Sequence, residues 1–228
     1  REVIREAFEA AGSSGRHVNR TGSRHGAPHA GRRSLAPMTR RTTPRTLLIP
    51  PASELAESTF VAMDFETANR LGGASACQIA LVRVADGVVT DELDTLIKPP
   101  SGWDHFEFTY LHGIGPGEVR DAPSWPAIAD QVRDFVADVP VYAHNAAFDR
   151  GVWAQLDEFF NTSTLPRRFY CSYRTARRMV PGLPNYKLPT VVHACNPSFE
   201  LDHHHAGSDA QACAQIVIAL QQMNPETL

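Results

Sequence analysis

Cysteine is scarce in this chain and forms no pattern. Its four cysteines are far apart in a sequence of 228 residues: Cys77, Cys171, Cys195 and Cys213. No Cys-x-x-Cys pair is present, so the usual spacing of a structural zinc site is excluded and no disulfide framework is indicated. We therefore expect buried thiols in a reducing cytoplasm.

Long apolar runs are absent as well. A membrane-spanning helix needs about 20 mostly apolar residues in succession, and no segment of the sequence approaches that length. No apolar segment follows a charged N-terminus in the manner of a signal peptide, and no internal repeat is visible. The sequence therefore predicts a cytoplasmic protein with no membrane partner.

The first part of the chain is poor in acidic and apolar residues. Residues 1–46 hold ten arginines against three glutamates, whereas residues 47–228 hold 12 basic and 22 acidic residues. A basic segment with few apolar side chains cannot bury a core, so we expect residues 1–57 to form a disordered tail. The tail could be a nucleic-acid-binding arm or simply solvated. The chain opens on Arg1, so translation could also begin at Met38.

The patterning of residues 58–228 predicts one α/β domain. Three β-rich stretches come first, and an Asp86-Gly87 turn between the second and third favours a hairpin. Segments with apolar residues at helical spacing then alternate with short segments typical of strands. We expect strands at 59–63, 76–84, 88–98 and 139–143, and helices that start near 124, 145, 173, 187 and 209. This order predicts a mixed β-sheet flanked by helices, where ligands collect at strand C-termini and helix N-termini.

Acidic residues fall at such points in separated clusters. Asp64 and Glu66 are two residues apart where the first strand is expected to end, so both side chains project to one side. Asp149 follows Asn145 by four residues, at the start of the next expected helix, where the helix dipole favours a carboxylate. Asn145 can cap that helix, which we expect to bury Phe148.

The third cluster joins Asp209 to three consecutive histidines. Ser208 and Gln211 have the spacing of a capping box, which predicts Asp209 at the first position of the last helix. His204 then precedes the helix and can converge with Asp209, whereas two positions five apart on one helix would diverge. The pattern alone does not choose among His203, His204 and His205.

Together these acids indicate a metal site. Carboxylates gathered at one point repel one another and lose hydration unless a cation lies between them. Hard oxygen ligands without a cysteine cluster favour Mg²⁺ or Mn²⁺ over zinc. Two such ions, with a histidine that takes a proton near neutral pH, would make a site that cleaves phosphodiesters.

The clusters resemble the three motifs of the DEDDh exonucleases, a family of the ribonuclease-H-like superfamily that includes the epsilon proofreading subunit of DNA polymerase III. The segment DFET is similar to the first motif, AHNAAFD to the second, and His204 with Asp209 to the third. The similarity extends to YLHGI at 110–114, DAP at 121–123 and NYKL at 185–188. It covers about residues 58–222.

The resemblance implies a ribonuclease-H-like fold and a 3′–5′ exonuclease that uses two divalent ions. It implies that Asp64, Glu66 and Asp209 bind one ion. It also implies that Asp64 and Asp149 place the second ion and that His204 is the general base. The product would be a nucleoside 5′-monophosphate, released from the 3′ end of single-stranded DNA.

A single-stranded end can be held when its last bases stack on apolar side chains. The candidates for substrate contact lie in or near the motifs: Phe65, Thr67, Leu111, His112 and Asn145. Phe65 could equally belong to the core, and His144 is more typical of a turn residue than of a catalytic one.

Other functions stay open at this point. An exoribonuclease is one, because discrimination rests on contacts to the 2′-hydroxyl that the sequence does not place. A non-catalytic nucleic-acid-binding module would be favoured by loss of an acid, and none is missing. A metal-binding protein without turnover would not need His204. The sequence ends at Leu228, soon after the last expected helix, so we expect no polymerase-contacting extension. A free-standing exonuclease that serves repair or end trimming therefore fits the sequence as well as a proofreading subunit that works with a polymerase.

Overall fold

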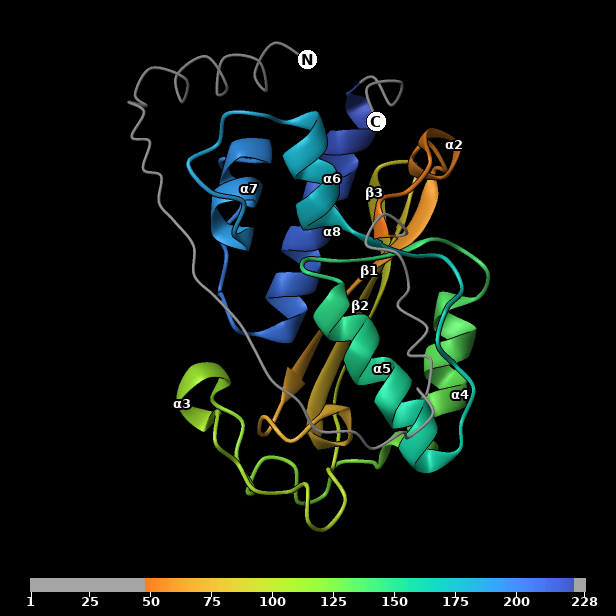
Figure 1. Ribbon diagram of the computed structural model, residues 1–228, viewed down its shortest axis with the longest axis vertical. Helices are drawn as coiled ribbons and strands as arrows, with labels where there is room; N and C mark the ends of the chain where they lie inside the picture. The colour runs from red at the N-terminus through yellow and green to blue at the C-terminus, as the bar shows by residue number, and fades with distance from the viewer. Residues whose placement is uncertain (1–47, 224–228) are drawn as a thin grey trace, which may run out of the picture.

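A five-stranded mixed sheet forms the centre of the computed structural model, which describes residues 48–223 (Figure 1). The strands are β1 Thr59–Thr67, β2 Ala76–Ala85, β3 Val88–Leu96, β4 Val141–Ala143 and β5 Phe169–Cys171. Their order is β3-β2-β1-β4-β5. The first three pair antiparallel as a meander, and β4 and β5 add parallel to the free side of β1. The mixed sheet expected from the sequence is confirmed.

Helices cover both faces of this sheet. They are α2 Ala52–Leu55, α3 Thr109–His112, α4 Trp125–Val136, α5 Ala147–Phe160, α6 Ser172–Met179, α7 Leu188–Cys195 and α8 Ala206–Gln222, with a 3-10 turn η2 at Gly73–Ser75. Figure 1 shows α4 and α5 on one side and α6, α7 and α8 on the other. No helix among the described residues is long and apolar enough to cross a bilayer.

Strand β1 is buried between the two helix layers because its residues alternate between two cores. Phe60 and Ala62 belong to the core beneath α8, whereas Met63 and Phe65 belong to the core beneath α4 and α5. Successive side chains of a strand point to opposite faces, so Asp64 and Glu66 share the face of Ala62. The chain therefore turns both acids toward α8. All four cysteines are buried and unpaired, as expected.

The first strand is longer than its apolar pattern indicated. It continues through the acids to Thr67, with Asp64 paired to Ala80 and Glu66 paired to Gln78 across the antiparallel ladder. The prediction that it ends at the acids is wrong, because the ladder with β2 holds the backbone extended whatever the side chains. A register shift between Glu66 and Thr67 ends the regular pairing there.

Two predictions about helix starts are wrong. Helix α5 begins at Ala147 without a side-chain cap from Asn145, and Phe148 is 46% exposed rather than buried. Helix α8 begins at Ala206, so Asp209 is its fourth residue. Ser208 Oγ accepts a hydrogen bond from Asp202 N, which lies outside the helix, and the expected capping box does not form.

The residues just before β1 belong to the folded body. The sequence pattern placed residues 48–57 in the tail, yet Leu55 of α2 is fully buried in the core beneath α8. Tyr170 donates a hydrogen bond to Glu54, and Arg168 pairs with Glu57. The expected tail is therefore too long at its C-terminal end. Residues 1–47, with Met38, lie outside the described residues.

Candidate active site

Three carboxylates from two elements meet at one point. Asp64 and Glu66 extend from β1 toward α8, and Asp209 comes from the first turns of α8. One oxygen from each of the three lies within 4.8 Å of the other two. Glu66 and Asp209 are largely buried, and Asp64 is partly exposed. Three oxygens at this separation can share one cation, so the structure brings together the ligands that the resemblance implies for the first ion.

Asp149 lies behind this trio, in the first turn of α5. Its side chain is only 1% exposed, and its Oδ1 accepts a hydrogen bond from Phe65 N at 3.1 Å. That bond ties α5 to the backbone between Asp64 and Glu66. Asp149 is not part of the tight group of three, but its charge acts on Asp64 and Glu66. All four predicted acids therefore occupy one neighbourhood.

The electrostatics of the four acids show mutual repulsion in a poorly hydrated place. Burial raises the pKa of Glu66 to about 8, and the charges of Asp209 and Asp149 add to the shift. Burial also raises the pKa of Asp149 to about 7, against the opposing hydrogen bond from Phe65 N. The pKa of Asp64 is raised by burial first and then by its three acidic neighbours. Such a cluster favours bound protons or cations.

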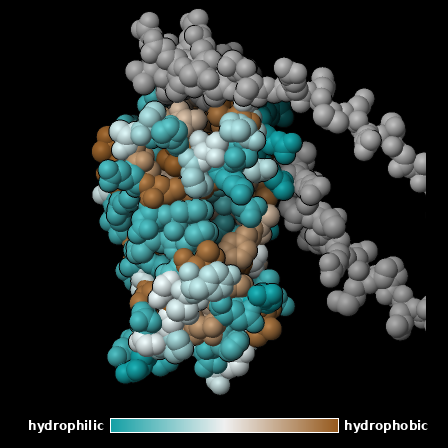
Figure 2. Space-filling view, turned by 90° about the vertical axis from the view of Figure 1, so that its left-hand side faces the viewer, coloured by the Kyte–Doolittle hydropathy of each residue, from teal (hydrophilic) through white to brown (hydrophobic). Residues whose placement is uncertain are grey.

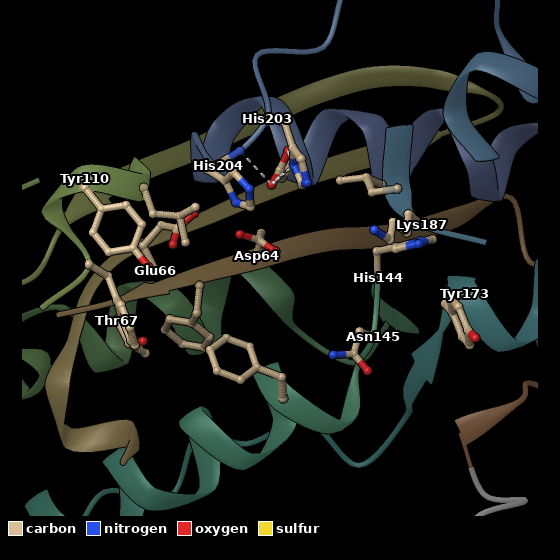
Figure 3. A pocket seen from close by; sticks show the side chains of 16 residues that line it. Asp64, Glu66, Thr67, Tyr110, His144, Asn145, Tyr173, Lys187, His203 and His204 are labelled. Carbon is tan, nitrogen blue, oxygen red and sulfur yellow. Dashed lines mark hydrogen bonds and ion pairs between the residues drawn. The ribbon is translucent and has the colours of Figure 1, made fainter. Parts of the chain in front are cut away.

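Two of the three histidines face this cluster. His203 Nδ1 lies 3.0 Å from each carboxylate oxygen of Asp209, and His204 N donates to Asp209 Oδ2 at 3.2 Å. The rings of His203 and His204 stack, with centroids 3.8 Å apart. Figure 3 shows both rings above Asp64. Burial lowers the pKa of His204, and His203 adds to that effect.

His205 lies elsewhere. Its side chain lines a different hollow, together with Asp94 and Gly207. His204 adopts a φ of +72°, an uncommon backbone angle for a residue with a side chain. This bend lets the backbone of His204 bond Asp209 while its ring faces the pocket. The sequence pattern did not reveal the contact from His203 to Asp209, because the contact depends on that bend.

Asp64, Glu66, Asp209 and the two histidines line a pocket of about 540 Å³. At one end stand Tyr110 and Leu111 of α3, which are 82% and 41% exposed, with Phe148 of α5 also in the wall. Tyr173 and Lys187 lie at the other end, and Asn145 lies between (Figure 3). Of the predicted substrate contacts, Thr67, Leu111 and Asn145 line this pocket. Tyr110, Phe148, Tyr173 and Lys187 were not predicted.

Two residues that were predicted to contact substrate instead contact other parts of the protein. Phe65 borders the pocket but is only 2% exposed, and its ring meets Trp153 edge-on with centroids 5.9 Å apart. His112 is not part of the pocket wall, because its ring bonds the backbone on both sides. Its Nδ1 accepts from Ile114 N, and its Nε2 lies 3.2 Å from Thr67 O. Both side chains support the site rather than face it.

His144 is also held from both sides. Its Nδ1 lies 2.9 Å from Ser172 Oγ and its Nε2 lies 2.9 Å from Tyr186 O. Burial lowers the pKa of His144 to about 4, so the ring is neutral at physiological pH. His144 lines the pocket, and the bond to Tyr186 O joins the loop before α5 to the segment before α7.

Comparison with known proteins decides the family. The family model RNase_T, described as "Exonuclease", matches residues 61–217. The chain belongs to this exonuclease family. The match runs from β1 to α8 and so contains all four acids and both pocket histidines. The resemblance to DEDDh exonucleases is thereby confirmed, and the molecule is an exonuclease of that family acting on nucleic acids.

Known relatives of this exonuclease are mostly longer. A Mycobacterium tuberculosis protein named as a bifunctional exonuclease/endonuclease is 30% identical over 185 residues, which are 75% of this chain and 28% of that protein. A PolC-type DNA polymerase III of Caldanaerobacter subterraneus is 27% identical over 72% of this chain and 12% of its own length. The exonuclease thus spans less than a third of either relative.

Solved structures share its fold. Exonuclease X in complex with 5′ overhanging duplex DNA is 25% identical, with a TM-score of 0.56, over 72% of this chain and 91% of that one. The nuclease domain of 3′hExo, a DEDDh family member bound to rAMP, superposes with a TM-score of 0.62 at 14% identity. That likeness covers 73% of this chain and 92% of the other. The ribonuclease-H-like fold is therefore confirmed.

Proposed function

We propose that this exonuclease removes nucleoside 5′-monophosphates one at a time from the 3′ end of single-stranded DNA, with two divalent cations, Mg²⁺ or Mn²⁺. The observation that carries the proposal is the meeting of Asp64, Glu66 and Asp209 within 4.8 Å, with Asp149 behind them. Bound cations would offset the repulsion among these acids, polarise the phosphate and lower the pKa of the attacking water.

The donor set fits such cations. All the predicted ligands are carboxylates, the hard oxygen donors that Mg²⁺ and Mn²⁺ prefer. Burial and the charges of neighbouring acids raise the pKa of each acid. A bound cation offsets both effects, because it replaces the lost hydration of the carboxylates and neutralises their charge. We assign Asp64 to both ions, as the resemblance implies: one of its oxygens lies within 4.8 Å of an oxygen of Glu66 and of Asp209, and the charge of Asp149 also raises its pKa.

His204 is the proposed general base. Its backbone, rather than its ring, bonds Asp209, so the ring nitrogens remain available to a water in the pocket. Its lowered pKa keeps the ring neutral near pH 7, the form that accepts a proton. In the proposed step the ring takes a proton from the water whose oxygen forms the new bond to phosphorus. The bond from phosphorus to the 3′ oxygen breaks, and that oxygen takes a proton from solvent to become the new 3′-hydroxyl of the strand.

The pocket suits one unpaired nucleotide. Its volume is about 540 Å³, and Tyr110 and Phe148 in its wall are 82% and 46% exposed. Exposed aromatic rings hold the bases of single strands by stacking. In Figure 2, which looks from the side of α3 and α7, hydrophobic patches on the coloured residues stay separated by hydrophilic surface. The two exposed rings in the pocket wall therefore support a single-stranded end as the substrate.

A direct test compares substrates side by side. Single-stranded DNA, duplex DNA and RNA of one sequence, each labelled at the 5′ end, are incubated with Mg²⁺, Mn²⁺ or a chelator. We expect a ladder of shortened 5′-labelled strands from the single-stranded DNA, nucleoside 5′-monophosphates as product, and no cleavage with the chelator. Faster loss of the RNA would favour an exoribonuclease instead. Immediate release of the 5′ label as mononucleotide would contradict the 3′–5′ direction.

The biological setting is a further part of the proposal. The similarity to PolC-type polymerases supports a proofreading context, while a free-standing enzyme would serve repair or end trimming. The chain covers 12% of the PolC-type relative, so that relative's polymerase activity lies outside the shared region. A 3′ end of DNA is the partner that the site itself supports.

A further inference from the structure

Charge is unevenly distributed along the folded body. Residues 159–199 contain six basic residues and no acidic one, although residues 47–228 as a whole hold 12 basic and 22 acidic residues. Half of the body's basic residues and none of its acids thus fall in one stretch of 41 residues. The stretch comprises β5, α6 and α7, the elements on the side of the pocket opposite α3. An acidic protein with a basic segment beside its site has a local attraction for polyanions.

Helix α6 displays this charge on one face. Ser172, Thr175 and Ala176 are buried beneath it, and the outward positions are Tyr173, Arg174, Arg177 and Arg178. Residues three and four apart are neighbours on a helix surface, so these four side chains form a continuous stripe. Arg177 and Arg178 are both exposed. The stripe rises about 6 Å from Tyr173 to Arg177, at about 1.5 Å per residue.

The stripe borders a second hollow that adjoins the first. This hollow, of about 530 Å³, is lined by the four stripe residues and Ile49. Tyr173 lines both hollows, and Lys187, another basic residue of the acid-free stretch, lines the active-site pocket beside it. Ile49 also brings the chain that follows the ten arginines of residues 1–46 to this place. The basic surface is therefore continuous with the end of the active-site pocket marked by Tyr173.

We propose that this basic stripe binds the phosphate backbone of the strand being degraded, a few nucleotides before its reacting end. The inference rests on the proposed function and extends it. The terminal nucleotide occupies the pocket near Tyr110, the strand passes Tyr173, and its phosphates meet Arg177 and Arg178. Guanidinium groups suit this task, because they stay charged and pair with phosphate oxygens through two hydrogen bonds.

The competing explanation is a solvated basic face with no ligand. Two observations weigh against it: the complete absence of acids over 41 residues of an acidic body, and the hollow shared through Tyr173 with the candidate active site. A solvated helix usually carries both signs of charge, as α4 does where Arg133 pairs with Asp130 and Asp134. That helix also supplies a matched control.

The test separates strand binding from chemistry by using two substrates. The p-nitrophenyl ester of thymidine 5′-monophosphate fills only the terminal site, whereas a 12-nucleotide DNA can reach α6. The variants are Arg177→Ala, Arg178→Ala and their combination, with Arg133→Ala on the other helix layer as control. We expect the double variant to cleave the ester at the wild-type rate and to show a KM for the oligonucleotide raised by about tenfold.

Binding gives a second readout that does not depend on turnover. The affinity for a fluorescent 12-nucleotide DNA, measured with the full chain in a chelator at several salt concentrations, should depend less steeply on salt in the double variant. The slope should fall by about 1.4, at about 0.7 for each phosphate of a single strand that the variant no longer neutralises. Arg133→Ala should leave both KM and slope unchanged.

The possible results distinguish failure of the basic-stripe assignment from failure of the proposed function. The assignment would be overturned if the double variant kept the wild-type salt slope and oligonucleotide KM while it cleaved the ester normally. The proposed function would then stay intact. If the wild type cleaved neither substrate, the proposed function would fall, and the salt slopes would still decide the stripe. Equal losses in the Arg133→Ala control would also overturn the assignment, since general charge would then explain the effect.

Discussion

His203 Nδ1 lies 3.0 Å from both carboxylate oxygens of Asp209, although His204 has the sequence spacing of the third motif. The two histidines therefore have different surroundings. The His203 ring is tied to a proposed metal ligand, while the His204 ring stacks on it and faces the pocket. An imidazole that bonds a ligating carboxylate orients that ligand. We infer that His203 positions Asp209 and that His204 handles the proton.

Histidine variants should separate these two tasks. His204→Ala should lower the maximal hydrolysis rate by about 10²–10⁴-fold, the usual contribution of a general base, with metal affinity retained. His203→Ala should instead raise the Mn²⁺ concentration for half-maximal activity by about 10–100-fold. Rates measured across a Mn²⁺ titration distinguish the two effects. His205→Ala, whose side chain lies in another hollow, is the control and should stay near the wild type.

A crippled His205→Ala variant beside an active His204→Ala variant would contradict the assignment of the base. The effect expected for His203 goes beyond the resemblance, which gives a role to His204 alone among the three histidines. The contact with Asp209 is the reason for this expectation.

Metal-free stability should fall as pH rises above 6.5. The folded-state pKa values of Glu66 and Asp149 are raised to about 8 and about 7, so these two carboxyl groups hold more protons in the folded protein than in the unfolded chain between about pH 4 and 8. Their contribution to the free energy of unfolding is therefore greatest at pH values below the unfolded pKa values. It is lost as the pH rises through the folded-state pKa values. Melting temperatures in a chelator and in Mn²⁺, from pH 6.5 to 9, should diverge because the cation replaces the protons that are released.

The choice of pH window avoids His144. Burial lowers its folded pKa to about 4, so its contribution to stability is complete above pH 6.5 and is lost as the pH falls from there toward 4. A cation-induced shift that stays constant from pH 6.5 to 9 would contradict the electrostatic account of the acid cluster. Asp149→Asn is the matched variant, and its chelator curve should depend less on pH.

Stacking at the rim should control affinity for the strand end. Tyr110→Ala should raise KM for single-stranded DNA by about 5–150-fold, as expected when one base is deprived of stacking worth about 1–3 kcal/mol. Steady-state rates measure the effect. Phe159→Ala is the control, because Phe159 is also an exposed aromatic residue, at 48%, but lies on α5 outside the pocket wall. Equal KM values for wild type and Tyr110→Ala would remove α3 from the binding site.

The basic N-terminal segment should be dispensable for chemistry. A chain that starts at Leu48 retains α2 and the buried Leu55, which the shorter form starting at residue 58 would lose. The form starting at Leu48 should cleave the nucleotide ester at the wild-type rate. It should bind DNA more weakly only at low salt, because contacts between arginine and phosphate are screened by salt. Failure of this form to fold or to cleave the ester would show that the segment takes part in the domain.

The sequence predicted those parts of the site that depend on local geometry. Asp64 and Glu66 share a face because strand side chains alternate, and no distant contact is needed to establish this. The order of strands and helices likewise follows from hydrophobic periodicity. Asp209 and His204 converge as predicted, but for another reason: α8 starts at Ala206, and a bend at His204 brings its backbone back to the acid.

The remainder depends on which surfaces meet in space. Phe148 has the spacing of a core residue, yet the first turn of α5 borders the pocket and leaves the ring exposed. His112 lies in a segment that resembles the family and was expected to contact substrate. Its ring instead bonds the backbone of Thr67 and Ile114. Tyr173 lies in no motif, and Lys187 lies in the NYKL segment, to which the resemblance gives no site role. Their place is set by packing of α6 and α7 beside the strand ends, which single-sequence patterns do not encode.

The hydrolysis rate of Asp64→Ala across a Mn²⁺ titration tests the central claim most directly, because Asp64 is the acid proposed to act on both cations. Single-stranded DNA labelled at the 5′ end is the substrate, and wild type in a chelator gives the zero. We predict cation-dependent shortening from the 3′ end by the wild type and less than about a tenth of that rate for Asp64→Ala at any Mn²⁺ concentration. Turnover of the folded variant above that level, or full wild-type activity in the chelator, would contradict the account.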